Sequence, residues 1–295
     1  MPISPFTKPP CTPSDLVALM QARGLAIEDV QRAERHIATV GYYRFMGYGK
    51  HYFDNQTQRF NAGVTYNHIW DAYIFDRKLR LLTLDAIERI EVAIRTAVSN
   101  AMCMAHGAHW FMDASVFNTP ANRNSFCAAL RKELPGKQNE IVRHYYNTYD
   151  YPNLPPSWMI MECISMGTWV KALGTLKQIE QKRIAATLGI NNISLVSWAS
   201  SLGWVRNVCA HHGILWNRIN MRPPKTPRPA MGYPSIAGKE NSYFATAVIA
   251  YGLLKLIVTQ STWVDRLEKL FTDYPLVDIA DMGFAPDWKN NPFWA

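Results

Sequence analysis

Residues 66–105 read YNHIWDAYIFDRKLRLLTLDAIERIEVAIRTAVSNAMCMA. Apolar residues recur here at steps of three and four, the spacing that gathers side chains on one face of an α-helix. Two acids also stand four residues before a base, Asp85 before Arg89 and Glu91 before Arg95, where ion pairs form along a helix. We therefore predict one long helix. Its apolar face comprises Ile69, Tyr73, Leu79, Leu82, Ala86, Ile90, Ile94 and Val98.

The segments on either side of this stretch are also mostly helical in pattern. Thr12-Pro13-Ser14-Asp15 combines an N-cap, a proline at the first helical position and an acid at the third, which predicts a helix to Arg23. Residues 42–64 are rich in Tyr, Phe and Gly without a helical period, so we expect irregular structure with room for a short hairpin. Further helices are expected over about 28–40, 124–134, 138–147, 157–173, 178–188, 195–217 and 241–273.

Strand patterns are scarce and no internal repeat is present, so the expected fold class is all-α. The chain has 295 residues, of which 48% are hydrophobic and 18% charged, a composition that supports a folded core. We divide it into an N-terminal helical and irregular section over residues 1–65 and a helical core over residues 66–295. The core includes a proline-rich basic loop over about 221–239 and a C-terminal helix.

The location of the protein is inferred from its apolar segments, its cysteines and its first residues. The most apolar long segment, 243–258, has 16 residues and contains Lys255, which suits a buried helix better than a membrane span. The five cysteines include no Cys-x-x-Cys pair, and residues 1–5 (MPISP) do not resemble a secretory signal. We expect a cytoplasmic protein with reduced thiols and no membrane partner.

The net charge of +8 comes from one region of the chain. No Asp or Glu occurs between Gln181 and Lys239, a stretch of 59 residues, whereas the rest of the chain carries 23 charges of each sign. Such a region attracts polyanions. A role in solubility alone is the alternative, but solubility does not require acids to be absent. The eight cations are Lys182, Arg183, Arg206, Arg218, Arg222, Lys225, Arg228 and Lys239.

Within this region, Arg206-Asn207-Val208-Cys209-Ala210-His211 is the candidate catalytic cluster. Residues five apart on an α-helix point about 140° apart, so Arg206 and His211 cannot face the same way from the middle of one helix. A continuous helix would instead align Asn207 and His211 with Ile214 and Arg218. A working site therefore needs Arg206 to curl around the helix start, or two copies of the segment to meet in a two-fold dimer.

The residue types of the cluster suit cleavage of RNA without a metal. A histidine can remove the proton of a ribose 2′-OH, and a second can protonate the leaving 5′-oxygen. An arginine can hold the phosphate and stabilise its transition-state charge. The alternative is that His211 only forms a hydrogen bond within helix packing.

We expect neither a metal nor a cofactor. Cys209, His211 and His212 lack a fourth ligand and would point in different directions from a helix. His106 and His109 stand where the long helix ends, and they fit a C-terminal cap better than a ligand pair. No phosphate-binding loop or dinucleotide motif is present.

The segment 206–218, RNVCAHHGILWNR, resembles the signature of the Abi-like abortive-infection proteins of bacteria, of the AbiD/AbiF type. That family is counted among the HEPN ribonuclease folds, whose motif is Arg, a polar residue, and His after four to six intervening positions. Met166 stands where the family more often has an aromatic residue. The other similar blocks are 42–48, 75–80, 85–92 with Arg95, and 156–158 with Glu162 and 165–167.

The resemblance covers about residues 8–218. It implies an all-helical HEPN core, a homodimer, antiviral defence, RNA as substrate and association with a small noncoding RNA. It assigns catalysis to Arg206 and His211 with Asn207 as the polar partner, and it leaves His212, Glu162 and Arg95 as possible supporting residues. The residues expected to bind RNA are Lys182, Arg183, Arg218, Arg222, Lys225 and Arg228.

Three functions remain open from the sequence. The first is a metal-independent endoribonuclease. The second is a non-catalytic protein that forms a complex with a small noncoding RNA, for which binding would weaken steeply with salt and survive loss of His211. The third is a helical phage-sensing scaffold with no RNA.

Overall fold

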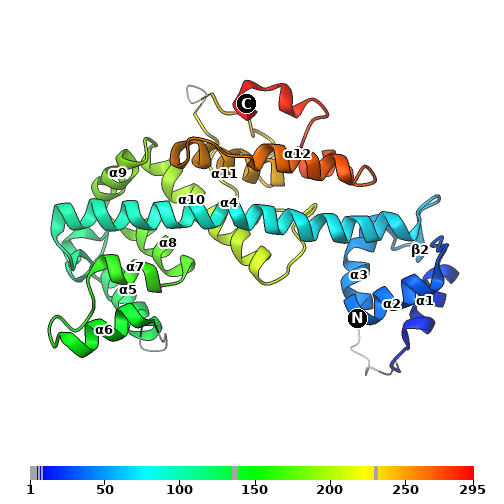
Figure 1. Ribbon diagram of the computed structural model, residues 1–295, viewed down its shortest axis with the longest axis horizontal. Coiled ribbons are helices and arrows are strands. Elements are labelled where there is room, and N and C mark those ends of the chain that lie inside the picture. The colour runs from blue at the N-terminus through cyan, green and yellow to red at the C-terminus, as the bar shows by residue number, and fades with distance from the viewer. Residues whose placement is uncertain (1–4, 6, 8, 135–138, 229–231) are drawn as a thin grey trace. The chain divides into compact units, whose positions relative to one another are not determined.

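The computed structural model describes residues 5, 7, 9–134, 139–228 and 232–295 (Figure 1). The all-α class is confirmed, because the described residues form twelve α-helices and one two-stranded sheet. The chain divides into two compact units, Met1–Leu79 with Lys269–Asp278, and Arg80–Glu268 with Ile279–Ala295. The division falls within α4 (Tyr66–His106) and within α12 (Trp263–Asp273).

The first unit contains α1 (Pro13–Ala22), α2 (Val30–Val40) and α3 (Tyr42–Gly49). The predicted capping box is confirmed, since the side chain of Thr12 accepts from the amide of Asp15 and the Asp15 carboxylate accepts from the amide of Thr12. Beyond α3, β1 (Phe53–Asp54) and β2 (Arg59–Phe60) pair antiparallel as a short hairpin.

The expectation of irregular structure over 42–49 is wrong. Gly41 has φ 86°, a conformation that lets the chain end α2 and begin α3 at the next residue. α3 then buries Phe45 and Tyr48, and the Tyr48 hydroxyl donates to Asp76 at 2.6 Å. Tertiary burial of aromatic residues, which local periodicity does not report, therefore decides this helix.

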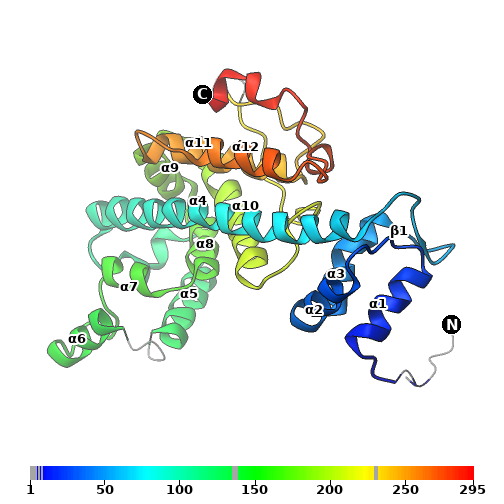
Figure 2. The ribbon, with the colours of Figure 1, turned by 45° about the vertical axis from the view of Figure 1, so that its right-hand side comes forward.

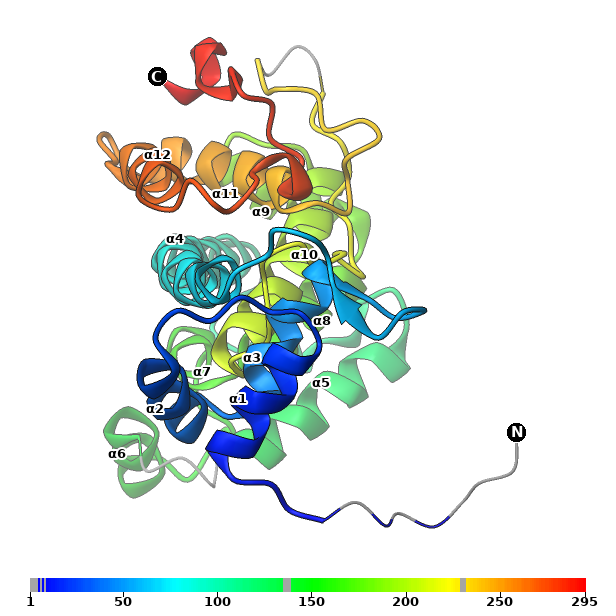
Figure 3. The ribbon, with the colours of Figure 1, turned by 90° about the vertical axis from the view of Figure 1, so that its right-hand side faces the viewer.

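In the second unit, the Arg80–His106 part of α4 lies between two groups of helices (Figures 1 and 3). On one side are α11 (Tyr243–Ile257) and the start of α12. The Thr83 hydroxyl is 2.8 Å from that of Tyr243, and Trp263 Nε1 donates to the carbonyl of Leu82 at 2.9 Å. The other side holds α5 (Pro120–Glu133), α6 (Glu140–Thr148), α7 (Ser157–Cys163) and α8 (Met166–Thr175). α9 (Gln178–Thr187) leads into α10 (Asn192–Ala210), which crosses α4 and contacts both α11 and α8 (Figure 1).

Three predicted helices are interrupted. The helix expected over 157–173 is α7 and α8, separated at Ser165, whose amide donates to the Glu133 carboxylate of α5 at 2.7 Å. The helix expected over 241–273 is α11 and α12, because Val258 has extended backbone. The helix expected over 195–217 ends at Ala210.

The core of the second unit explains the apolar 243–258 segment. Every residue of α11 from Tyr243 to Leu254 is buried, and Lys255 reaches the carbonyl of Phe293 at 3.0 Å. The prediction of a buried helix is confirmed. No helix among the described residues is sufficiently long and apolar to span a bilayer.

Candidate functional site

The candidate cluster lies at the C-terminal end of α10, where the helix closes in a Schellman-type turn. The amide of His212 donates to the carbonyl of Cys209 at 3.2 Å, and that of Gly213 donates to Val208 at 2.8 Å. His212 has φ 56°, the left-handed conformation that glycine usually supplies at this position. We refer to Arg206–Gly213 as the tip.

Two of the predicted catalytic side chains share one face of the tip. Asn207 and His211 are one turn apart, and both are exposed. Arg206 is half-buried, and its Nη1 donates to Asn207 Oδ1 at 3.4 Å. The guanidinium is therefore drawn toward the amide that stands one turn before His211. Trp204, half-buried, lies on the same face one turn earlier.

The predicted extension of this face to Ile214 and Arg218 is wrong, because both residues lie beyond the last turn of α10. Instead, residues 214–220 run back along α10, and we name them the return segment. The Arg218 guanidinium carbon lies 6.0 Å from the centre of the Trp204 ring, and Asn220 Nδ2 donates to Ser201 Oγ at 3.0 Å. Arg218 thus lies near the face of Trp204 and Asn207 because the return segment folds back along α10, and not because α10 continues to residue 218.

Arg80 of α4 fixes the far side of the tip. Its Nη1 donates to the carbonyl of Gly213 at 3.1 Å, and the residue is only 6% exposed. A hydrogen bond from a buried guanidinium to a main-chain carbonyl is among the stronger kinds in proteins. The two residues are 133 positions apart in the chain, so no local sequence pattern points to Arg80 as part of the site.

The basic loop is anchored by its main chain and exposes its charges. The amide of Lys225 donates to Ser197 Oγ at 2.8 Å, and its carbonyl accepts from Trp198 Nε1 at 2.9 Å. Tyr233 packs against Gly252 of α11 so closely that a Cβ there would lie 2.0 Å from its ring. The side chains of Arg218, Arg222, Lys225 and Arg228 are all exposed.

Lys182 and Arg183 are not brought to the tip. They belong to α9, which leads into the opposite end of α10 (Figure 2). Both are exposed, and Arg183 Nε donates to Glu180 at 3.1 Å. Glu180 also meets His106 Nε2 at 3.0 Å. Burial raises the pKa of Glu180, but hydrogen bonds from His106 and Arg183 outweigh it, so this pKa lies below its usual value.

The supporting residues Arg95 and Glu162 lie near the turn between α7 and α8. Arg95 pairs with Glu91, as predicted, and its Nη2 donates to the carbonyl of Ile164 at 2.9 Å. Glu162 is exposed. Within the described ranges, no hydrogen bond or ion pair joins either residue to Arg206 or His211.

The histidines expected to cap α4 have separate partners. α4 ends at His106, and Gly107 follows with φ 84°, so the predicted helix end is confirmed. His109 Nε2 lies 3.0 Å from the carbonyl of Leu154. In the part of the chain that the structure describes, no group of three or more His, Cys, Asp or Glu side chains could hold a metal ion.

A family model described as Abi-like protein matches residues 35–217. The match covers more than half of the chain and runs from α2 through the tip into the return segment. Among curated proteins and among solved structures, no significant match is found.

Proposed function

The chain belongs to the family of Abi-like proteins, and on that premise we propose that it is a metal-independent endoribonuclease with a HEPN-type site. Family membership indicates a function in abortive infection, and we assign this protein to antiviral defence of the AbiD/AbiF type. One observation carries the enzymatic proposal: at the tip, an exposed histidine and asparagine share a face to which an arginine is drawn. Exposed cations of the basic loop follow directly in the chain.

The proposed reaction uses the nucleophile that RNA already contains. His211 removes the proton of a ribose 2′-OH, and the 2′-oxygen attacks the adjacent phosphorus. As the bond from phosphorus to O2′ forms, the bond to O5′ breaks, and a second imidazole protonates the leaving oxygen. Arg206 stabilises the phosphorane charge. The products are a 2′,3′-cyclic phosphate and a 5′-hydroxyl, with no change of oxidation state.

The second imidazole comes from another copy of the chain in this proposal. Asn207 and His211 face one way from α10, whereas Arg206 starts from a position about 140° around the helix from His211. A two-fold dimer that joins two tips across one phosphate supplies two histidines and two arginines. The hydrogen bond from Arg206 to Asn207 supports such a site by turning the guanidinium toward the face that would meet the partner.

We predict that Arg206→Ala and His211→Ala each reduce RNA cleavage in EDTA by about 100-fold or more, the usual contribution of a general acid–base or charge-stabilising group. The measurement is the initial rate on a labelled single-stranded RNA, with end-group analysis for cyclic phosphate. His144→Ala is the matched control, because that histidine is exposed on α6. Cleavage by both tip variants at the wild-type rate refutes the proposal.

The second candidate is a non-catalytic partner of a small noncoding RNA. The exposed Arg222, Lys225 and Arg228 on a loop that is anchored by its main chain favour it equally. This function predicts that RNA binding weakens steeply with salt and is the same in the wild type and in His211→Ala. It also predicts that neither the wild type nor the variant cleaves RNA.

A further inference from the structure

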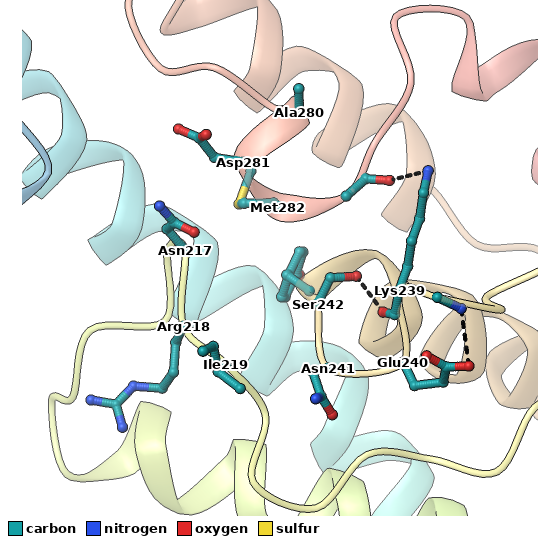
Figure 4. A pocket seen from close by; sticks show the side chains of 13 residues that line it. Asn217, Arg218, Ile219, Lys239, Glu240, Asn241, Ser242, Ala280, Asp281 and Met282 are labelled. Carbon is teal, nitrogen blue, oxygen red and sulfur yellow. Dashed lines mark hydrogen bonds between the residues drawn. The ribbon is translucent and has the colours of Figure 1, made fainter.

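A cavity of about 390 Å³ opens beside the return segment, between residues 217–219, residues 238–243 and residues 280–283 (Figure 4). All of these residues belong to the second unit. The volume lies at the lower end of the range of about 300–1,000 Å³ that is typical of small-molecule sites. It suits one small planar group and its immediate attachments, and it is too small for folded RNA.

The lining combines apolar walls with polar groups. Tyr243 and Met282 are buried, and Ile219 is exposed at the rim. The amides of Asn217 and Asn241 and the carboxylates of Glu240 and Asp281 supply both donors and acceptors. Apolar faces with a polar edge are the chemistry of a nucleobase, which stacks through its faces and is read at its edges.

The polar lining is held by its own hydrogen bonds. Glu240 Oε1 accepts from the amide of Gly238 at 3.1 Å, and the Ser242 hydroxyl donates to the carbonyl of Lys239 at 2.7 Å. Lys239 Nζ donates to the carbonyl of Gly283 at 2.9 Å. Gly283 closes this wall, since a Cβ there would lie 2.7 Å from Ser242 Oγ. Groups fixed in this way discriminate between ligands better than mobile ones.

Charge favours a neutral group inside the cavity and a phosphate at its margin. Within the lining, Lys239 stands with Glu240 and Asp281, so the interior carries no excess of positive charge, although the 59 residues from Gln181 to Lys239 contain no acid. In Figure 4 the Arg218 side chain extends away from Ser242 and Met282, and its guanidinium lies over Trp204 of α10. The cation therefore stands between the cavity and the face that carries Asn207 and His211.

The distance along α10 relates the cavity to the tip. Trp204 and His211 are seven residues apart, which is about 10 Å at 1.5 Å per residue. A stacked strand advances about 3.4 Å per nucleotide, so about three nucleotides span that length.

We propose that this cavity binds one unpaired nucleobase of the RNA, about three or more nucleotides from the cleaved phosphate, and that Glu240 and Asn241 select a base with an exocyclic amine. The identity of the ligand rests on the proposed function, which makes RNA the substrate. Carboxylates accept hydrogen bonds from exocyclic amines, and asparagine pairs with adenine edges. Uracil, which has no exocyclic amine, is the base that the site disfavours.

The test uses the full-length protein and the four ribonucleoside 5′-monophosphates, with binding measured by calorimetry or saturation-transfer NMR. We expect at least one amine-bearing nucleotide to bind about fivefold or more tightly than uridine monophosphate, the lower limit for one well-formed base contact. Asn241→Trp fills the cavity and should abolish this binding. The exposed Asn124→Trp of α5 is the matched control and should bind as the wild type does.

A second variant and a second readout keep the outcomes separate. Glu240→Gln keeps an acceptor for the Gly238 amide but loses the carboxylate, so it should reduce the base preference without filling the cavity. Sequencing of cleaved RNA should show the same preference at a fixed position about three or more nucleotides from the cut. Equal binding of all four nucleotides, or unchanged preference in both variants, overturns the cavity proposal and leaves the nuclease intact. Selective nucleotide binding without any RNA cleavage overturns the proposed nuclease activity and leaves the proposed base-binding role of the cavity.

Discussion

Arg80 links the tip to α4. Its guanidinium is buried, and it donates to Gly213, which is two residues beyond His211. A hydrogen bond to a charged group contributes about 1.5–3 kcal/mol, and displacement of a catalytic group by about 1 Å can reduce a rate about 100-fold. Arg80 does not need to touch RNA to affect the proposed cleavage, so we predict that it acts as a positioning residue.

We predict that Arg80→Met lowers the free energy of unfolding by at least about 1.5 kcal/mol and lowers kcat at least about tenfold, because the Gly213 carbonyl loses its donor. The dissociation constant for RNA should change little, since the side chain is buried. Arg80→Lys should recover part of kcat by restoring a charged donor.

The measurements are chemical denaturation, single-turnover cleavage and equilibrium RNA binding. Arg89→Met is the control, because Arg89 lies on the same helix and makes a partly exposed ion pair with Asp85, a contact of about 0–1 kcal/mol. If Arg80→Met weakens RNA binding as much as it slows cleavage, Arg80 acts through binding and the positioning role is wrong.

At the scale of elements, α11 acts as the base on which the C-terminal part of the basic loop rests. The Tyr233 ring lies against Gly252, and burial raises its pKa to about 12. Glycine is a poor helix former, but α11 has no room for a larger residue at position 252 because the Tyr233 ring occupies the space. The contact holds Tyr233 in place near the C-terminal end of a segment that has five prolines between residues 221 and 237.

We expect Gly252→Ala to destabilise the protein by about 1–3 kcal/mol, the cost of overpacking a filled core, and to weaken RNA binding by releasing the loop. Gly174→Ala in α8 is the matched control, since a Cβ there meets only Val196 at 3.8 Å. That change should be neutral or stabilising by up to about 1 kcal/mol. Thermal unfolding and RNA binding of the two variants provide the comparison, and equal behaviour would argue against the anchor.

The elements also show what sequence periodicity can and cannot predict. The 41 residues of α4 were predictable because the apolar spacing and the pairs Asp85–Arg89 and Glu91–Arg95 are local. The break between α7 and α8 was not, because it depends on Glu133, which is 32 residues from Ser165. The end of α10 was missed because His212, rather than glycine, takes the left-handed position and apolar residues follow.

The same distinction applies to the candidate site. Arg206, Asn207 and His211 were identified from their spacing and from the acid-free region, and the structure places Asn207 and His211 on one exposed face. Arg80 could not be identified as part of the site, because its role arises when distant segments meet. Trp204 shares the helical stripe of Asn207 and His211, and only its contact with Arg218 depends on the return segment. The return segment was mistaken for helix for the same reason, since its contacts to Ser201 and Trp204 are tertiary.

At the scale of the whole molecule, the composite site makes a prediction about mixed dimers. A dimer of Arg206→Ala chains lacks both arginines, and a dimer of His211→Ala chains lacks both histidines. A mixed dimer of the two variants retains one of each, and a two-fold site brings them together. The mixed dimer should therefore cleave RNA faster than either parent dimer. The increase should be larger than the difference in cleavage rate between the two parents.

The mixed dimer is obtained by coexpression with two affinity tags and purification on both. Arg206→Ala chains carrying the two different tags provide the control, which should stay as inactive as the singly tagged protein. Light scattering establishes that the purified species contains two chains. A dimeric mixed species no more active than its parents would rule out a site in which one arginine and one histidine from different chains suffice.

His212 places a conformational cost at the end of α10. A side chain in the left-handed region is disfavoured by about 1–2 kcal/mol relative to glycine, and such strain tends to persist where it serves activity. A directed-evolution experiment that selects only for heat resistance would therefore favour glycine or asparagine at this position. If the imidazole supports the proposed cleavage, selection for phage resistance would retain it, so the two selections would separate a role of this residue in folding from a role in defence.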